Sequence, residues 1–131
     1  MDTIFTKIIK GEIPCYKIAE NEHCFAFLDI SPLAQGHTLV VPKIQEDYIF
    51  DLDDELLAEL TIFSKSVAKA IRKTIPCERI GVAVIGLDVP HAHIHLIPLQ
   101  QTGTLDFKAP RIKLSAEEMT ALSVKISNAF V

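Results

Sequence analysis

Three histidines, His91, His93 and His95, stand at alternate positions within the segment HAHIHLIP. Successive side chains of a β-strand point to opposite faces, so this spacing predicts one face of imidazoles and one apolar face with Ala92 and Ile94. The apolar face is typical of a core strand. Three imidazoles are not, because each needs hydrogen-bond partners when buried, and three cations close together repel one another. The imidazole face therefore indicates a site for a phosphate or a metal.

Two kinds of chemistry suit such a face, and the residues alone leave both open. Neutral imidazole is a common ligand of zinc. Alternatively, one imidazole attacks phosphorus while its neighbours orient it and donate hydrogen bonds. Histidine suits this second role because its unperturbed pKa of about 6.5 leaves a neutral nucleophile available at neutral pH.

The elements that position these histidines follow from the hydrophobic pattern. Apolar residues at helical spacing predict helices over residues 3–9 and 53–74, and a last helix from Ser115, which forms a capping box with Glu118. Strands are predicted over residues 15–20, 23–29, 37–41, 79–85 and 91–97. Consecutive strands, rather than strict alternation with helices, predict an α+β fold. We expect an antiparallel sheet of about five strands, with the long helix packed on it and short helices at both ends of the chain.

Length, charge and cysteine content limit the class of protein. With 131 residues, of which 49% are hydrophobic, the chain is expected to form one domain spanning residues 1–131. A formal charge of −4 without a basic block argues against binding of a nucleic acid polymer. The three cysteines form no Cys-x-x-Cys pair, and no segment is typical of a secretion signal or a membrane span. We therefore expect a cytoplasmic protein with no membrane association.

Three stretches of the chain resemble the histidine triad (HIT) family. HAHIHLIP resembles the motif that defines the family, in which three histidines alternate with hydrophobic residues. TIFTKIIKGEIP (residues 3–14) resembles the family's N-terminal helix and turn, and FAFLDISPLAQGHTLVVPK (residues 25–43) resembles its central segment. The three stretches occur in the family's order, so the resemblance implies a HIT-like fold.

The same resemblance implies a function. It implies a nucleotide-binding hydrolase or transferase that acts at the α-phosphate of a nucleoside phosphate derivative through a covalent nucleotidyl-histidine intermediate. The expected partner is a small purine nucleoside monophosphate derivative, and the expected assembly is a homodimer without a cofactor. The leaving group stays open among phosphoramidate, dinucleoside polyphosphate, nucleotide sugar and acyl-adenylate. The alternative is a non-catalytic nucleotide-binding regulatory or scaffold protein.

Residue roles are implied by matching positions. His93 is the expected nucleophile, His95 is expected to contact the phosphate or leaving group, and His91 to hold the array. His37 is expected to reach it from the adjacent strand. Asp29 is expected to accept hydrogen bonds from the ribose, although its place before Ser31-Pro32 also suits a turn. The expected base pocket consists of residues that periodicity alone would assign to the core: Ile4, Phe5, Ile8, Phe27, Leu28 and Ile30.

Two positions depart from the family's pattern. Relatives often carry Gly-Gln-Ser or Gly-Gln-Thr before the triad, whereas this chain has Leu87 and Asp88, followed by Val89 and a proline. The backbone amides of Asp88 and Val89 are expected to contact phosphate. Two loop paths are open: Leu87 and Asp88 replace the phosphate-holding pair, or Leu87 packs into the core while Asp88 hydrogen-bonds a histidine or an amide. We favour the second. In addition, Thr3 and Thr6 replace a zinc-binding Cys-x-x-Cys found in some relatives, so no metal site is expected.

Overall fold

The computed structural model describes residues 1–100 and 105–131. It contains three α-helices and a short 3₁₀ helix, which are α1 (Ile4–Ile9), η1 (Ile49–Asp51), α2 (Asp54–Thr74) and α3 (Ala116–Ala129). The strands are β1 (Lys17–Glu20), β2 (Cys24–Leu28), β3 (Thr38–Pro42), β4 (Arg79–Ala83) and β5 (Ile94–Leu99).

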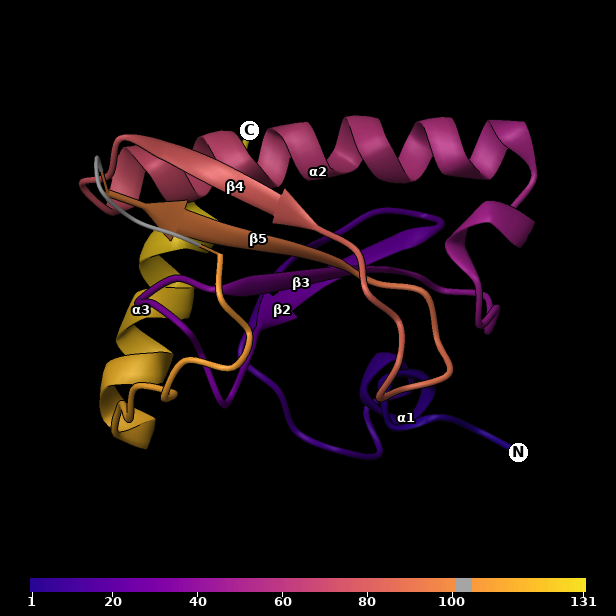
Figure 1. Ribbon diagram of the computed structural model, residues 1–131, viewed down its shortest axis with the longest axis horizontal. Helices are drawn as coiled ribbons and strands as arrows, with labels where there is room; N and C mark the ends of the chain where they lie inside the picture. Colours follow the sequence, from indigo (N-terminus) through magenta and orange to yellow (C-terminus); the bar gives the residue numbers. More distant parts are fainter. Residues whose placement is uncertain (101–104) are drawn as a thin grey trace.

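The five strands form one sheet in the order β1-β2-β3-β5-β4 (Figure 1), and each neighbouring pair is antiparallel. The long helix α2 runs along the sheet, and α3 follows the last strand. The α+β prediction is therefore confirmed. No helix among residues 1–100 and 105–131 has the length and apolar character needed to cross a membrane.

Side-chain caps set where the helices begin. Thr3, Asp53 and Ser115 each accept a hydrogen bond from a backbone N–H in the first turn of α1, α2 and α3. Ser115 and Glu118 form the predicted capping box. Such caps satisfy N–H groups that have no partner inside the helix. Because they are encoded in the sequence, the predicted helix starts agree with the structure to within one residue.

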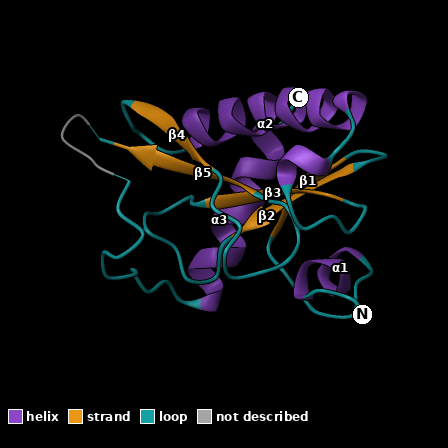
Figure 2. Cartoon of the chain, turned by 45° about the vertical axis from the view of Figure 1, so that its right-hand side comes forward, coloured by secondary structure: helices purple, strands orange, loops and turns teal. Residues whose placement is uncertain are grey.

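The two faces of the sheet carry two separate hydrophobic clusters. Alternate side chains such as Ala26 in β2, Val40 in β3 and Ile94 in β5 join a large core with α2 and α3. The opposite side chains, among them Phe27 and Leu39, join a smaller cluster with Phe5 of α1. Helix α1 therefore lies on the face that α2 and α3 leave free, apart from them in both views (Figures 1 and 2).

The strand that carries the histidines begins later than predicted. β5 starts at Ile94, so His91 and His93 lie in the connection from β4 rather than within the ladder. The reason is that the Ala92 N–H donates to Glu46 O and the His91 N–H to Val89 O, instead of to β3. The alternation of faces persists nonetheless, because Ala92 and Ile94 both pack in the large core.

Candidate active site

The predicted histidines come together on the face of the sheet that α2 and α3 leave free. His37, His91, His93 and His95 are all buried, and the two most accessible, His93 and His95, are 6% and 8% exposed. The ring centroids of His93 and His95 are 5.0 Å apart, and those of His37 and His95 are 5.2 Å apart. The site is therefore a compact group of imidazoles rather than a row of isolated side chains.

His37 lies immediately before β3, after a glycine with unusual backbone geometry. Gly36 has a φ of +93°, and a Cβ at this position would clash with Ile75. Only glycine adopts this conformation readily and leaves room for the neighbour. The turn at Gly36 therefore delivers His37 into the site.

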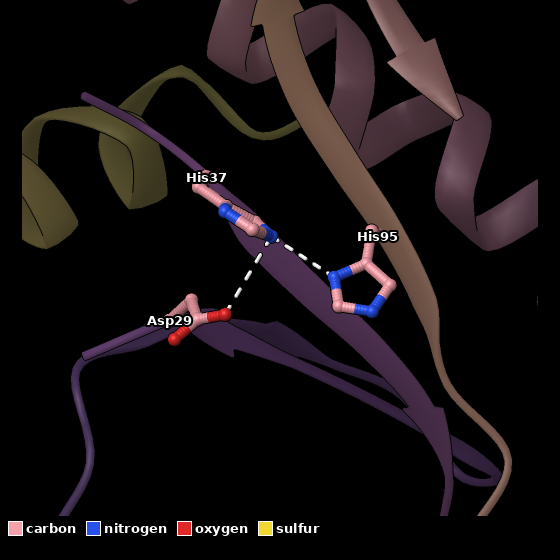
Figure 3. Close-up of side chains that lie close together, drawn as sticks. All are labelled: Asp29, His37 and His95. Carbon is pink, nitrogen blue, oxygen red and sulfur yellow. Dashed lines mark hydrogen bonds and ion pairs between the residues drawn. The ribbon is translucent and has the colours of Figure 1, made fainter. Parts of the chain in front are cut away.

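A directed chain of hydrogen bonds determines which nitrogen of His95 faces the site. The Leu33 N–H donates to His37 Nδ1 at 3.0 Å, so neutral His37 carries its proton on Nε2. His37 Nε2 is 2.9 Å from His95 Nδ1 (Figure 3), so it donates and His95 Nδ1 accepts. Neutral His95 must then carry its own proton on Nε2. His95 thus presents an N–H donor.

A second chain gives His93 the opposite character. His91 Nε2 donates to the carbonyl oxygen of Pro42 at 2.9 Å, because a carbonyl only accepts. His93 Nδ1 donates to the carbonyl oxygen of His91 at 2.7 Å. Neutral His93 therefore keeps a lone pair on Nε2. His93 presents an acceptor, or nucleophile, beside the donor of His95.

Burial keeps the supporting histidines neutral. It lowers the pKa of His37 to about 3 and that of His95 to about 4, and the charges of neighbouring histidines and of Arg111 add to the effect. The pKa of His91 is also lowered, first by burial and then by the charge of His93, against the hydrogen bond to Pro42. Neutral imidazoles are what both directed chains require.

Asp29 lies at the rim of this group. Its Oδ1 accepts from the Ser31 N–H at 2.8 Å, which is the turn geometry expected of an aspartate at this place. Its Oδ2 lies 3.5 Å from His37 Nε2 (Figure 3), and burial raises the pKa of the carboxyl group. The turn contact uses one oxygen and leaves the other directed to the site.

Asp29, His37 and His95 are also the residues best placed to hold a metal in the described part of the chain. One ligand atom from each lies within 4.8 Å of the others. Because His37 Nε2 and His95 Nδ1 share a hydrogen bond, an ion would have to replace the proton between them. The absence of a metal stays a prediction.

The sequence-predicted base-pocket residues separate into three groups. Phe5 and Phe27 contact each other with ring centroids 5.5 Å apart, Phe5 lies 5.1 Å from the His93 ring, and Ile8 packs against the same cluster. Ile4 and Ile30 are exposed, Ile30 by 78%, so they lie at the surface. The prediction for Leu28 is wrong. Leu28 is buried in the core with α2 and α3, on the other face of the sheet, because it is one residue out of phase with Phe27.

Comparison with known proteins identifies the family. A family model of the HIT domain matches residues 10–102. An adenosine 5'-monophosphoramidase from Schizosaccharomyces pombe is 38% identical over 130 residues, covering 98% of this chain and 98% of the relative. The chain belongs to the histidine triad family.

Solved structures of HIT proteins share the fold over almost the whole chain. A HIT-like protein from Bartonella henselae has a TM-score of 0.85 at 32% identity and covers 98% of this chain and 96% of its own. A zinc-bound histidine triad protein from Mycobacterium smegmatis has a TM-score of 0.85 at 26% identity, with coverages of 99% and 94%. The HIT fold predicted from the motifs is confirmed.

The connection before the triad does not take the path favoured from the sequence. Leu87 is 87% exposed, so the prediction that it packs into the core is wrong. Asp88 is exposed as well. Val89 packs against the cluster of Phe5 and Phe27, and its carbonyl accepts from the His91 N–H. At the positions where relatives often carry glutamine and a hydroxyl residue, the exposed Leu87 and Asp88 thus stand in this chain.

Two residues of the segment after β5 cover the site and escaped the sequence analysis. The Phe107 ring lies 4.7 Å from His95 and 6.2 Å from His37, and the Arg111 guanidinium lies 5.6 Å from the centre of the Phe107 ring. Arg111 Nη1 donates to Ser31 O at 3.0 Å, which ties the segment to the loop before β3. No periodicity marks an irregular segment, so the sequence held no signal for this cover.

A cavity of about 530 Å³ also opens beside His93. It is lined by Tyr48, which precedes η1, by Phe50 within η1, and by residues 84–87 after β4. The sequence analysis assigned no role to Tyr48 or Phe50. Their place in the wall of this cavity depends on the path of the connection between β4 and β5, which the sequence does not predict.

Proposed function

We propose that this HIT protein hydrolyses or transfers the nucleotidyl group of a small nucleoside phosphate derivative through a covalent bond to His93. The observation that carries the proposal is the pairing of opposite functions in two adjacent imidazoles. His93 Nε2 offers a lone pair and His95 Nε2 offers a proton, with ring centroids 5.0 Å apart. The relationship to an adenosine 5'-monophosphoramidase supports the same class of activity.

In the proposed reaction, His93 Nε2 forms a bond to the α-phosphorus as the bond to the leaving group breaks, and the leaving group departs with the electron pair of that bond and takes a proton from solvent water. The proton on His93 Nδ1 stays there and is donated to the His91 carbonyl oxygen, so the phosphorus-bonded ring is an imidazolium. The His95 N–H donates to a phosphoryl oxygen as charge develops there. The oxygen of a water or an acceptor hydroxyl then bonds to phosphorus and its proton passes to solvent. The P–N bond breaks with its electron pair returning to Nε2, so His93 departs as a neutral imidazole, which is a good leaving group.

The substrate is proposed to lie between the aromatic cluster and Asp29. Phe5 and Phe27 offer apolar surface for a purine base next to His93. The free oxygen of Asp29 is placed to accept from the ribose hydroxyls. The protein is further proposed to act as a cytoplasmic homodimer.

One observation favours the alternative of a non-catalytic nucleotide-binding protein. The side chains of Leu87 and Asp88 supply no hydrogen-bond donor for phosphate where relatives often have glutamine and a hydroxyl residue. A lost donor to the developing charge costs about 3 kcal/mol of barrier. Binding without useful turnover would then follow.

The test is turnover of adenosine 5'-phosphoramidate by the purified protein, with mass spectrometry of rapidly quenched samples. We expect release of AMP and a protein adduct one adenylyl group heavier, located on His93. His93→Ala is expected to form no adduct while binding AMP within about tenfold of the wild type, or about 1.4 kcal/mol. Tight AMP binding without turnover of this or other α-phosphate derivatives would instead establish the non-catalytic reading.

A further inference from the structure

A polar cluster joins the start of α1 to the first histidine of the triad. Thr3 Oγ1 lies 2.8 Å from His91 Nδ1, and Thr6 Oγ1 lies 3.3 Å from the same nitrogen. Gln45, from the segment after β3, accepts from the Thr6 hydroxyl at 2.7 Å and from the Thr3 N–H at 2.9 Å. Thr3 and Thr6 therefore contact His91 directly, and Gln45 joins the cluster through these two threonines.

The directions of these hydrogen bonds follow from one another. Because His91 Nε2 donates to Pro42 O, neutral His91 has only a lone pair on Nδ1. The Thr3 hydroxyl must therefore donate to it. The Thr6 hydroxyl donates to Gln45 Oε1, and Gln45 Nε2 donates to Met1 O at 2.7 Å. Each donor in the cluster thus meets an acceptor, and a network satisfied in this way selects a single arrangement.

His91 passes this arrangement to His93. Its ring accepts from the Thr3 hydroxyl at Nδ1 and donates to the Pro42 carbonyl oxygen from Nε2. Its backbone N–H donates to Val89 O. The remaining group, its carbonyl oxygen, accepts from His93 Nδ1 at 2.7 Å. These contacts fix the position of the residue, and a displacement of the His91 backbone would move this oxygen away from His93 Nδ1.

We propose that Thr3, Thr6 and Gln45 are positioning residues for the reaction, because their network holds His91 where its carbonyl orients the His93 nucleophile. This inference rests on the proposed role of His93. Thr3, Thr6 and Gln45 act through His91 and His93 in this proposal, and none of the three touches the substrate.

The network also couples the substrate pocket to the nucleophile. Thr3 caps α1 through the Thr6 N–H, and α1 carries Phe5, whose ring lies 5.8 Å from His91 and 5.1 Å from His93. A shift of α1 on binding a base would therefore move the Thr3 hydroxyl and the aromatic wall together. The position of α1 and the orientation of the His93 ring are therefore coupled.

Two substitutions at Thr3 separate its hydroxyl donor from its role as a helix cap. Aspartate and serine both cap helices well, so Thr3→Asp and Thr3→Ser both preserve α1. A carboxylate accepts but does not donate, so in Thr3→Asp the His91 Nδ1 must take a proton, whereas Thr3→Ser keeps the donor. We expect kcat of Thr3→Asp to fall about tenfold, equivalent to about 1.36 kcal/mol of barrier, with KM within about twofold. Thr3→Ser is expected to stay near the wild type.

A second variant and a spectroscopic measurement keep the test independent of folding and of turnover. Gln45→Met removes the acceptor from an exposed residue and is expected to lower kcat in the same direction, whereas Thr61→Val removes a hydroxyl from α2 and is expected to leave kcat unchanged. Nitrogen-15 NMR of the imidazoles should show a protonated His91 Nδ1 in Thr3→Asp only. Wild-type kcat and unchanged ring tautomers in Thr3→Asp would overturn the inference. A wild-type protein without turnover would contradict the proposed function instead, and the tautomers would still report on the network.

Discussion

The two imidazoles proposed to react, His93 and His95, are both tied to the protein through Nδ1, but by hydrogen bonds of opposite polarity. His93 is tied through Nδ1 to a carbonyl, and His95 through Nδ1 to the N–H of another histidine. A hydrogen bond of opposite polarity at the same ring atom therefore makes one residue an acceptor toward the substrate and the other a donor. Residue type alone does not encode this difference, because it depends on the partner that the fold supplies.

The first prediction concerns Asp29. Asp29→Asn keeps an oxygen for the Ser31 N–H and so preserves the turn, but it places an NH₂ group where Oδ2 faces the site. We expect AMP affinity to fall about tenfold, or about 1.4 kcal/mol, and the affinity for 2′,3′-dideoxy-AMP to change little. Isothermal titration calorimetry measures both ligands. Equal losses for the two would show that Asp29 serves only the turn.

The sequence brought the candidate histidines to one face but did not predict the geometry of the candidate site. Alternation along the chain placed the three histidines on one face, and it would also have excluded Leu28 from a pocket on the Phe27 side. Resemblance to the family overrode that periodicity, wrongly. The contacts of Thr3 with His91 and with Gln45 join residues 88 and 42 positions apart, for which a single sequence has no signal.

At the scale of elements, local signals decided what was predictable. Caps at Thr3, Asp53 and Ser115 marked the helix starts. The start of β5 was missed because His91 and His93 have strand-like alternation but bond to other partners. The alternation of apolar and polar residues predicts which way side chains point, whereas the first and last residues of a strand depend on its pairing with a distant segment.

The second prediction tests the connection between β4 and β5. Because Leu87 and Asp88 are exposed, Leu87→Gln with Asp88→Ser should leave the melting temperature nearly unchanged, as surface changes usually stay within about 0.5 kcal/mol. The double variant adds a donor beside the cavity at His93 and removes a negative charge. We expect a higher kcat/KM for adenosine 5'-phosphoramidate, with each effect worth about 1–3 kcal/mol.

A matched control for this loop is Val124→Gln, which adds an amide to an exposed valine of α3. It should alter neither stability nor turnover. Lower turnover in an equally stable double variant would mean that the apolar loop itself favours the reaction. In that case Leu87 would act as part of the cavity wall rather than as a lost donor.

At the scale of the whole molecule, one edge of the sheet carries exposed apolar side chains in the described part of the chain. β4 is an edge strand, and its Val82 is 62% exposed, with Val84 and Ile85 exposed just beyond it. Such an edge pairs readily with another chain unless it is covered. The third prediction is a homodimer formed through β4, with light scattering giving twice the mass of one chain at micromolar concentration.

Lysine substitutions locate that interface. Val82→Lys places a charge on the edge and should give a monomer, whereas Val124→Lys, on α3, should remain dimeric. A wild-type protein of monomer mass would refute the dimer. A dimer that persists in Val82→Lys would move the interface away from β4.

The last prediction concerns acid stability, which the buried histidines control together. The pKa of His95 is lowered to about 4 and that of His37 to about 3, whereas an unfolded histidine titrates at about 6.5. Below about pH 6.5 the unfolded chain therefore binds protons that the folded chain does not, so stability falls as the pH falls. Each of the two should remove about 2 kcal/mol of unfolding free energy between pH 7 and pH 5, at about 1.36 kcal/mol per pH unit.

Urea unfolding at pH 7 and pH 5 measures this loss, and two variants assign it. His95→Gln removes one of the buried groups and should lose about half of the pH dependence. His23→Gln is the matched control, because His23 is exposed and Glu59 raises its pKa, which contributes with the opposite sign. An equal unfolding free energy at both pH values in the wild type would mean that His37 and His95 take up protons in the folded state. The hydrogen bonds from Leu33 to His37 and from His37 to His95 would then be lost, and they could not be what places a proton on His95 Nε2.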